Sequence, residues 1–139
     1  MDNDIRNEFE KGTAKPYNIL PHSFPFVMLD KVLDVEKGRR GKGEKLVTCD
    51  DYPGRGDMFP QVLLLEASAQ LSGIVSGREE GGYLAGMKNI HFEKNVMPGD
   101  VVEFESVMQG VFGGMYIFRV SARVGNETVM KGDIYLALA

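Results

Sequence analysis

The pattern of apolar and polar positions marks out one long helix near the middle of the chain. Residues 61–75 are apolar at almost every position, which is typical of a helix that is buried on all sides. Pro60 suits the first position of a helix, Gly77 suits its end, and a glycine pair at 81–82 breaks the chain beyond it. The pattern therefore predicts a buried helix over residues 61–77.

Strand patterns flank this helix on both sides. Before it, residues 26–35 are β-branched and apolar, a turn is expected at 37–38, and residues 43–49 fit the second strand of a hairpin. After the helix, four further segments fit antiparallel strands: residues 83–96, 101–111, 115–124 and 128–138. One buried helix with a strongly antiparallel sheet is an α+β architecture, and a helix that is apolar on all faces requires the sheet to wrap around it. We expect residues 1–139 to form a single domain of this kind.

An acid interrupts the apolar helix. Glu66 lies in its middle, and an ionised carboxylate is almost never fully buried without a partner, because the loss of hydration costs more than packing returns. Gln70 follows four residues later on the same helical face, and Gly73 and Gly77 extend that face without side chains. Two interpretations are open. The face is the floor of a slot for a thin ligand, or the Glu66–Gln70 pair is internal and fixes the orientation of the helix.

Composition narrows the class of protein. A chain of 139 residues with 43% hydrophobic and 26% charged residues is ordinary for a globular protein with a real core. A net charge of -4 argues against nucleic acid as a partner. The first 15 residues lack the apolar stretch of a signal peptide, no run is long enough to span a membrane, and the single Cys49 cannot form an internal disulfide. We therefore expect a cytoplasmic protein with no membrane partner.

Three motifs resemble one family. They are LPHSFPFVMLDKV at residues 20–32, VLLLEASAQ at 62–70, and YLAGM at 83–87 followed by Phe92 and by VMPGD at 96–100. In this order they resemble the bacterial 3-hydroxyacyl-[acyl-carrier-protein] dehydratases of fatty-acid synthesis (FabZ-like). The resemblance implies a hotdog fold, in which an antiparallel sheet wraps around one long central helix. It also implies a homodimer or higher homo-oligomer with acyl tunnels at the subunit interface.

The resemblance also implies roles for individual residues. The family removes water from a 3-hydroxyacyl thioester, carried on acyl carrier protein or coenzyme A, with a histidine from one subunit and the helix glutamate, here Glu66, from the other. The backbone N–H at the helix start, here Gln61, holds the thioester oxygen. Gln61 is therefore an expected substrate-binding residue, and the slot interpretation of the helix face adds Gln70 and Gly73. No cofactor and no metal are expected.

The catalytic histidine of the family is missing from its usual place. No histidine lies between His22 and His91, and residues 50–59 form a shortened segment where the family has Gly-His-Phe-Pro. Counting back from Glu66 puts Tyr52 at the position of the histidine, and Tyr52 is a proton donor but a poor base. His22 is the leading substitute, since imidazole titrates near working pH; the alternative is that it caps a turn or packs at the rim of the tunnel. His91 falls on the polar side of its strand and is expected to face solvent.

Three functions therefore stay open. The chain is a dehydratase with an unconventional second catalytic group, a non-catalytic acyl-binding or partner subunit, or a thioesterase that activates water with Glu66. A basic cluster between the first two strands has two interpretations as well: it steers an acidic carrier protein, or its charges protect a solvated hairpin edge. The cluster comprises Lys37, Arg39, Arg40, Lys42 and Lys45.

Overall fold

The computed structural model describes residues 28–48, 58–77 and 82–138, which form one antiparallel sheet and one helix. The sheet has six strands in the order β1-β2-β4-β5-β6-β3, and every neighbouring pair is antiparallel. The α+β prediction is confirmed. The elements are β1 (Lys31–Glu36), β2 (Arg40–Leu46), α2 (Gln61–Ser76), β3 (Gly82–Phe92), β4 (Val101–Phe112), β5 (Met115–Val124) and β6 (Glu127–Leu138).

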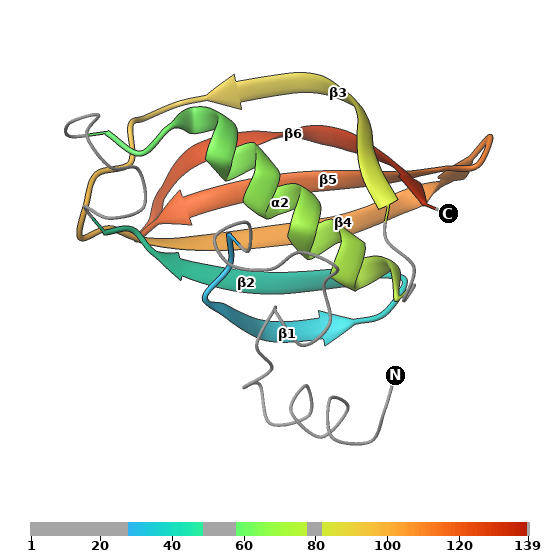
Figure 1. Cartoon of the computed structure of the whole chain (residues 1–139), viewed down its shortest axis with the longest axis horizontal. Coiled ribbons are helices and arrows are strands. Elements are labelled where there is room, and N and C mark those ends of the chain that lie inside the picture. Colours follow the sequence, from blue (N-terminus) through green and yellow to red (C-terminus); the bar gives the residue numbers. More distant parts are fainter. Residues whose placement is uncertain (1–27, 49–57, 78–81, 139) are drawn as a thin grey trace.

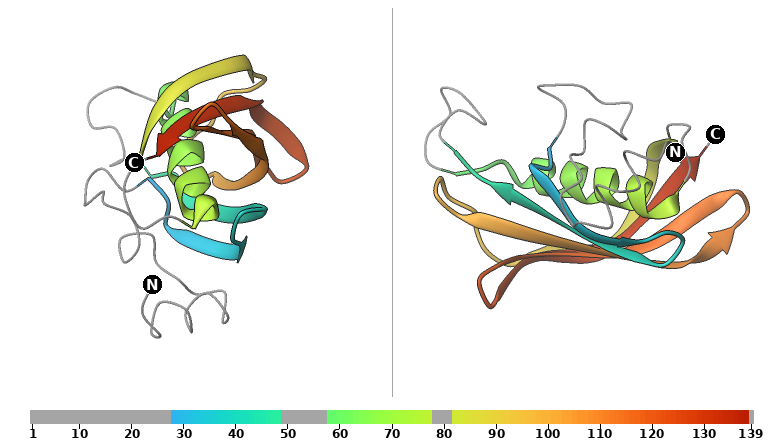
Figure 2. Two further views of the ribbon diagram at one scale, coloured as in Figure 1. Left: turned by 90° about the vertical axis from the view of Figure 1, so that its right-hand side faces the viewer. Right: turned by 90° about the horizontal axis from the view of Figure 1, so that it is seen from below.

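The sheet curls around α2, as expected. In Figure 1 the helix runs across the sheet between β1 and β3, and Figure 2 shows that the strands bend around it on one side. β3 follows the helix in sequence yet pairs with β6, the last strand, so that β1 and β3 form the two edges of the sheet. The helix therefore lies in the concave face of the sheet, and the convex face is turned away from it.

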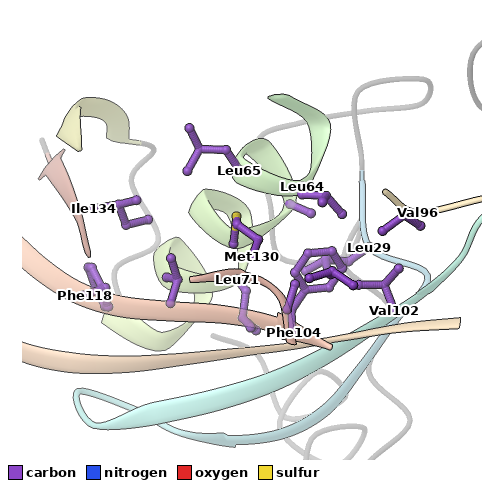
Figure 3. Packing of buried hydrophobic residues seen from close by; sticks show 14 of the residues in the cluster. Leu29, Leu64, Leu65, Leu71, Val96, Val102, Phe104, Phe118, Met130 and Ile134 are labelled. Atoms are coloured by element: carbon purple, nitrogen blue, oxygen red, sulfur yellow. The ribbon is translucent and has the colours of Figure 1, made fainter. Parts of the chain in front are cut away.

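The core lies between α2 and the concave face. Leu64 and Leu71 of the helix and Phe104, Phe118 and Met130 of the sheet are fully buried, and Figure 3 shows these side chains gathered between the two layers. Alternate residues of each strand face the helix, because side chains of a strand point to opposite faces in turn. Full burial of each such side chain contributes about 1.5–3 kcal/mol, so this layer dominates the stability of the domain.

A pair of buried hydroxyls connects the helix to the sheet. Ser72 of α2 and Ser106 of β4 are fully buried, and their oxygens lie 2.6 Å apart in a hydrogen bond. Ser72 Oγ also lies 2.8 Å from the carbonyl oxygen of Ser68, to which it donates. Because buried polar groups are costly unless they are hydrogen-bonded, this pair favours one register of the helix on the sheet.

The ends of α2 differ slightly from the prediction. Pro60 is the N-cap, with ψ at 129°, and the first helical residue is Gln61. Gly77 ends the helix as predicted: its φ of 73° is left-handed, and its N–H donates to the carbonyl of Ile74. The strand β3 ends at Phe92 instead of Val96. Val96 forms an isolated bridge to Phe59, just before the helix.

The prediction that the helix is buried on all sides is wrong for the single chain. One stripe of α2, spaced at i, i+4, i+7, i+11 and i+14, is exposed or only half-buried. Val62, at its beginning, is 65% exposed. The stripe faces away from the sheet. It includes Glu66 and Gly73, two members of the face that one interpretation of the sequence made the floor of a slot, whereas Gln70 of that face is buried. The stripe comprises Val62, Glu66, Ala69, Gly73 and Ser76.

Candidate active site

Glu66 lies on this open stripe and is half-buried. Its neighbour Gln70 is only 2% exposed. The Gln70 Nε2 amide donates to Glu66 Oε1 at 3.3 Å, and the Gln70 Oε1 atom accepts from the backbone N–H of Met28 at 2.8 Å. The helix thus presents a carboxylate, held from the side by an amide, at the boundary between the core and the open stripe.

The beginning of α2 provides a second polar element. The first N–H groups of a helix have no carbonyl partner within the helix, and the macrodipole makes this end positive. The structure shows no side-chain cap at Pro60 and no acidic residue in the first turn. Gln61 and Glu66 are five residues apart, which is about 7.5 Å along the axis at 1.5 Å per residue.

Gly73 borders open space. A Cβ atom built on this residue would meet no atom within 4 Å. Gly73 lies on the open stripe seven residues after Glu66, about 10 Å further along the helix. Its contact with substrate stays a prediction, as do those of Gln61 and Gln70.

The two residues predicted to replace the family histidine lie outside the described part of the chain. These are His22 and Tyr52. His91, in contrast, is described: it is exposed and pairs with Lys131 of β6, on the convex side of the sheet. The adjacent pair, Phe92 and Met130, points to the concave side. His91 therefore lies on the opposite face of the sheet from α2, in agreement with the expectation that it faces solvent.

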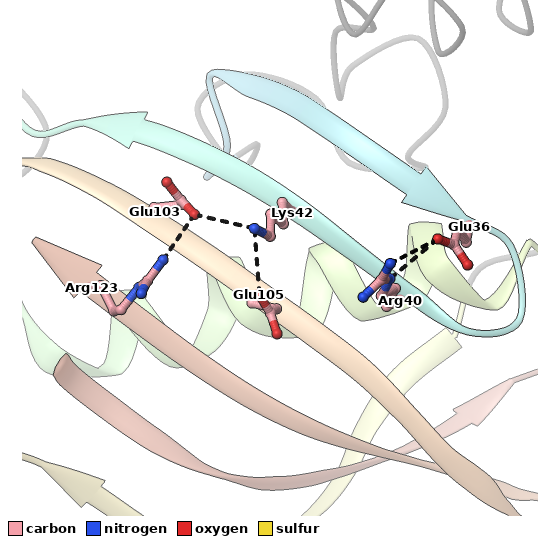
Figure 4. A network of polar contacts seen from close by, with 6 residues as sticks. All are labelled: Glu36, Arg40, Lys42, Glu103, Glu105 and Arg123. Carbon is pink, nitrogen blue, oxygen red and sulfur yellow. Dashed lines mark hydrogen bonds and ion pairs between the residues drawn. The ribbon is translucent and has the colours of Figure 1, made fainter. Parts of the chain in front are cut away.

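The basic cluster is largely neutralised by neighbouring acids. Arg39 and Arg40 both pair with Glu36, at 3.2 and 3.1 Å. Figure 4 shows how the convex face continues this pattern, with Lys42 of β2 near two glutamates of β4 and Arg123 of β5 beside one of them. Alternating charges on exposed strands add little stability but keep an outer face solvated. The structure favours this role over a free basic surface.

Lys45, the last member of that cluster, is in fact buried. It is 6% exposed on the concave face of β2, and its ammonium lies 4.0 Å from Asp30 Oδ1. Asp30 Oδ2 accepts from the backbone N–H of Leu46 at 2.7 Å. Sequence reasoning missed this pair. Its only sequence signal is that Lys45 follows the glycines at 41 and 43 at strand spacing, in phase with the inward-facing positions.

Apolar side chains are exposed around the open stripe and along the edge strand beside it. Met87 of β3 is 51% exposed, and Phe92 at the end of that strand is 36% exposed. Met58 and Met97, near the beginning of α2, are 43% and 40% exposed. Contiguous exposed apolar surface marks interfaces and ligand-binding grooves.

No helix within residues 28–48, 58–77 and 82–138 is long and apolar enough to cross a membrane. No three histidine, cysteine, aspartate or glutamate side chains in these ranges come together as metal ligands would.

The fold and this helix define the class: an α+β hotdog domain, with an antiparallel sheet wrapped around a single helix. Residues 20–133 match the model of the FabA-like domain family. The chain belongs to this family, among the FabZ-like hotdog dehydratases, and the resemblance seen in the three motifs is confirmed.

Relatives and solved structures agree with this assignment. The chain is 35% identical over 132 residues to the 3-hydroxyacyl-[acyl-carrier-protein] dehydratase FabZ of Acetivibrio thermocellus, covering 87% of this chain and 90% of that protein. It is 34% identical to the FabZ of Sinorhizobium medicae, with 88% of each chain covered. The dehydratase heterocomplex ApeI:P of Xenorhabdus doucetiae contains a similar fold, with a TM-score of 0.80, 18% identity, and 90% and 91% of the two chains covered.

Proposed function

We propose that this protein removes water from 3-hydroxyacyl thioesters, with Glu66 as an acid/base group. The supporting observation is the position of Glu66: it is the only ionisable side chain of α2, half-buried on the open stripe and oriented by Gln70. The relatives of this protein are named 3-hydroxyacyl-[acyl-carrier-protein] dehydratases, and this name favours an acyl thioester on acyl carrier protein as the substrate. A fold neighbour from Streptococcus pneumoniae contains coenzyme A, which makes that carrier the second substrate to test.

The proposed reaction needs one base and one acid. The C–H bond beside the thioester carbonyl breaks, and its electron pair forms the new carbon–carbon double bond. The C–O bond at the next carbon breaks, and the departing oxygen takes up a proton and leaves as water. The N–H of Gln61 at the positive end of α2 would stabilise negative charge on the thioester oxygen while the carbanion character develops.

The second catalytic group distinguishes this chain from its family. His22 is the leading candidate and Tyr52 the alternative, both from the sequence alone. Because no histidine stands where the family places it, we expect slow turnover by the homodimer. Loss of one acid/base group typically costs about a hundredfold to ten-thousandfold in rate.

The test is a turnover assay with 3-hydroxyacyl thioesters on both carriers, following formation of the enoyl thioester and release of the free carrier thiol. Glu66→Gln should abolish dehydration while the fold and thioester binding persist, because the amide keeps the shape of the carboxyl group. Glu105→Gln makes the same chemical change on the exposed face, where Glu105 pairs with Lys42, and should leave the rate unchanged. His22→Ala should remove the residual activity if His22 is the second group.

Two results would contradict the proposal. Unchanged dehydration by Glu66→Gln would remove Glu66 from the mechanism. Release of free carrier thiol without an enoyl product would identify a thioesterase, the function of the fluoroacetyl-CoA thioesterase FlK that shares this fold at a TM-score of 0.63.

A second candidate is a partner subunit that holds the Glu66 half of the site while another hotdog chain supplies the histidine. One observation favours it: of the two histidines in the sequence, His91 lies on the convex face, away from α2. The neighbour from Xenorhabdus doucetiae is itself part of a dehydratase heterocomplex. In the same assay this candidate predicts tight thioester binding without turnover by the chain alone, and turnover after addition of a family member that carries the histidine.

A further inference from the structure

The beginning of α2 is bonded to a part of the chain that is distant in sequence. Pro60 supplies no side-chain cap, so the helix lacks the usual anchor of an N-terminus. Phe59, just before it, donates its backbone N–H to the carbonyl oxygen of Val96 at 2.8 Å. Phe59 and Val96 are 3% and 1% exposed, so this bridge lies in the core. The segment that contains Val96 therefore helps to determine where the helix begins.

Val96 leads directly into a tight turn formed by residues 97–100. Their sequence, Met-Pro-Gly-Asp, fits a type II turn, with proline at the second position and a glycine with a φ of 97° at the third. The backbone N–H of Asp100 donates to the carbonyl oxygen of Met97 at 3.0 Å. The Asp100 side chain closes the turn a second time, because its Oδ2 atom accepts from the backbone N–H of Met97 at 2.9 Å. Two hydrogen bonds thus fix the chain directly after Val96.

The same turn is bonded to the residue that follows β2. Val47, which is 2% exposed, donates its backbone N–H to the carbonyl oxygen of Asp100 at 2.9 Å. The carbonyl oxygen of Val47 accepts in return from the N–H of Gly99 at 2.8 Å. The turn is therefore connected to the sheet on one side and, through Val96, to the residue before α2 on the other. A displacement of this turn would move the beginning of the helix relative to the sheet.

We infer that the turn of residues 97–100 positions the N-terminus of α2, and that Asp100 is a positioning residue for the thioester site there. The inference rests on the proposed function for its catalytic consequence, in which the Gln61 N–H stabilises the thioester oxygen. Such a donor must lie within about 2.7–3.1 Å of the developing charge, and a misplacement of about 1 Å costs about a hundredfold in rate. Asp100 does not touch the substrate itself; it acts through Val96 and Phe59.

Two glycines at opposite ends of β4 give a matched test of the turn. Gly99 precedes this strand and Gly114 follows it, and both have left-handed φ values, of 97° and 80°. A Cβ atom added at either position would meet no atom within 4 Å, so an alanine there strains the backbone without disturbing packing. Gly99→Ala strains the turn that follows Val96, whereas Gly114→Ala strains the turn between β4 and β5.

A second pair of variants tests the side chain of Asp100. Asp100→Ala removes the acceptor of the Met97 N–H, whereas Asp100→Asn keeps an oxygen that can accept from it. A role of this hydrogen bond thus predicts that asparagine restores what alanine removes.

Hydrogen exchange followed by NMR tests the geometry without any turnover. The amides to follow are those of Phe59, bonded to Val96, and of Leu63 in the first turn of α2, bonded to the carbonyl of Pro60. Gly99→Ala and Asp100→Ala should speed their exchange about tenfold, whereas Gly114→Ala and Asp100→Asn should stay within about twofold of the wild type. Unchanged exchange in both Gly99→Ala and Asp100→Ala would overturn the inference. Equal acceleration in Gly114→Ala would overturn it as well, because the effect would then be one of global stability.

The kinetic measurement is kcat and KM for the 3-hydroxyacyl thioester. Gly99→Ala and Asp100→Ala should lower kcat about tenfold to a hundredfold with KM within about threefold of the wild type, because the Gln61 N–H acts on the transition state. Gly114→Ala and Asp100→Asn should keep most of kcat. An unchanged kcat in Gly99→Ala and Asp100→Ala, or a change in KM alone, would overturn the positioning role in catalysis. The expected exchange pattern together with an inactive wild type would support the positioning of the helix while rejecting the proposed function.

Discussion

At the scale of single residues, the pair formed by Lys45 and Asp30 is the least expected feature of the structure. The side chain of Lys45 is 8% exposed, whereas that of Asp30 is 49% exposed. Water can therefore solvate the carboxylate but barely reaches the ammonium. The energetic consequence is asymmetric. Removal of the Asp30 carboxylate leaves the charge of Lys45 in the core, whereas removal of the Lys45 ammonium leaves a carboxylate that water can solvate.

This asymmetry can be measured by urea denaturation. Asp30→Ala should lower the free energy of unfolding by about 1–3 kcal/mol, because it removes a carboxylate beside the buried Lys45 ammonium and the acceptor of the Leu46 N–H. Lys45→Met, which keeps the length of the side chain without its charge, should cost less. An equal or larger loss in Lys45→Met would show that the ammonium itself contributes net stability.

At the scale of elements, the edge strand β3 is shaped by a bulge. Lys88 pairs with Asp133 and His91 with Lys131, so that Asn89 and Ile90 together face the single residue Gly132 of β6. Asn89 has a φ of 56°, the left-handed conformation that asparagine tolerates better than most residues. Ile90 fills the space that a side chain at position 132 would need. Its Cδ1 and Cα would lie 2.3 and 2.9 Å from a Cβ atom there.

Gly132→Ala should therefore displace the bulge. The methyl group meets the backbone of β3 as well as the end of a side chain, so simple rotation of Ile90 does not relieve the contact. We expect a loss of about 1–3 kcal/mol in unfolding free energy, the usual cost of overpacking, and faster hydrogen exchange along β3. Gly110→Ala, at a position with open space in the bulged part of β4, is the control and should cost under about 1 kcal/mol. Equal losses in the two variants would contradict the role of the Ile90 contact.

At the scale of the whole molecule, the open stripe of α2 and the edge strand β3 lie on the part of the chain that the expected dimer would cover. β3 has a sheet neighbour on one side only, β6, and its residues Tyr83 and Met87 are 70% and 51% exposed. An edge strand with exposed apolar side chains favours pairing with another chain. We propose that β3 of two subunits lie together, so that each Glu66 lies near the interface.

Met87→Asp tests this arrangement. The wild-type protein should have a mass in solution of twice the 15.4 kDa chain, measured by light scattering after size-exclusion chromatography. A carboxylate at position 87 would lose its hydration in the interface and should shift the protein toward the monomer. Leu46→Asp changes an equally exposed residue of β2, far from β3 in the sheet order, and should leave the mass unchanged. A monomeric wild type, or a dimer insensitive to Met87→Asp, would reject β3 as the interface.

The sequence by itself determined the order and type of the elements. Alternation along β4, β5 and β6 and the long, mostly apolar run of α2 gave their bounds to within a few residues, because these patterns follow from the geometry of strand and helix alone. The motifs also gave the family and singled out Glu66. The position of Lys45 in the core could not be predicted in this way, and the sequence could not decide whether the face with Glu66 was open or internal.

Tertiary structure decided those features for one physical reason. Whether a side chain is buried depends on which element packs against it, and the pairing of β3 with β6 and the curl of the sheet bring together residues that are far apart in the chain. The hydrogen bond from Met28 to Gln70 spans 42 residues, so no local pattern could reveal it. The sequence supplied the carboxylate of Glu66, and the tertiary structure determined what lies around it.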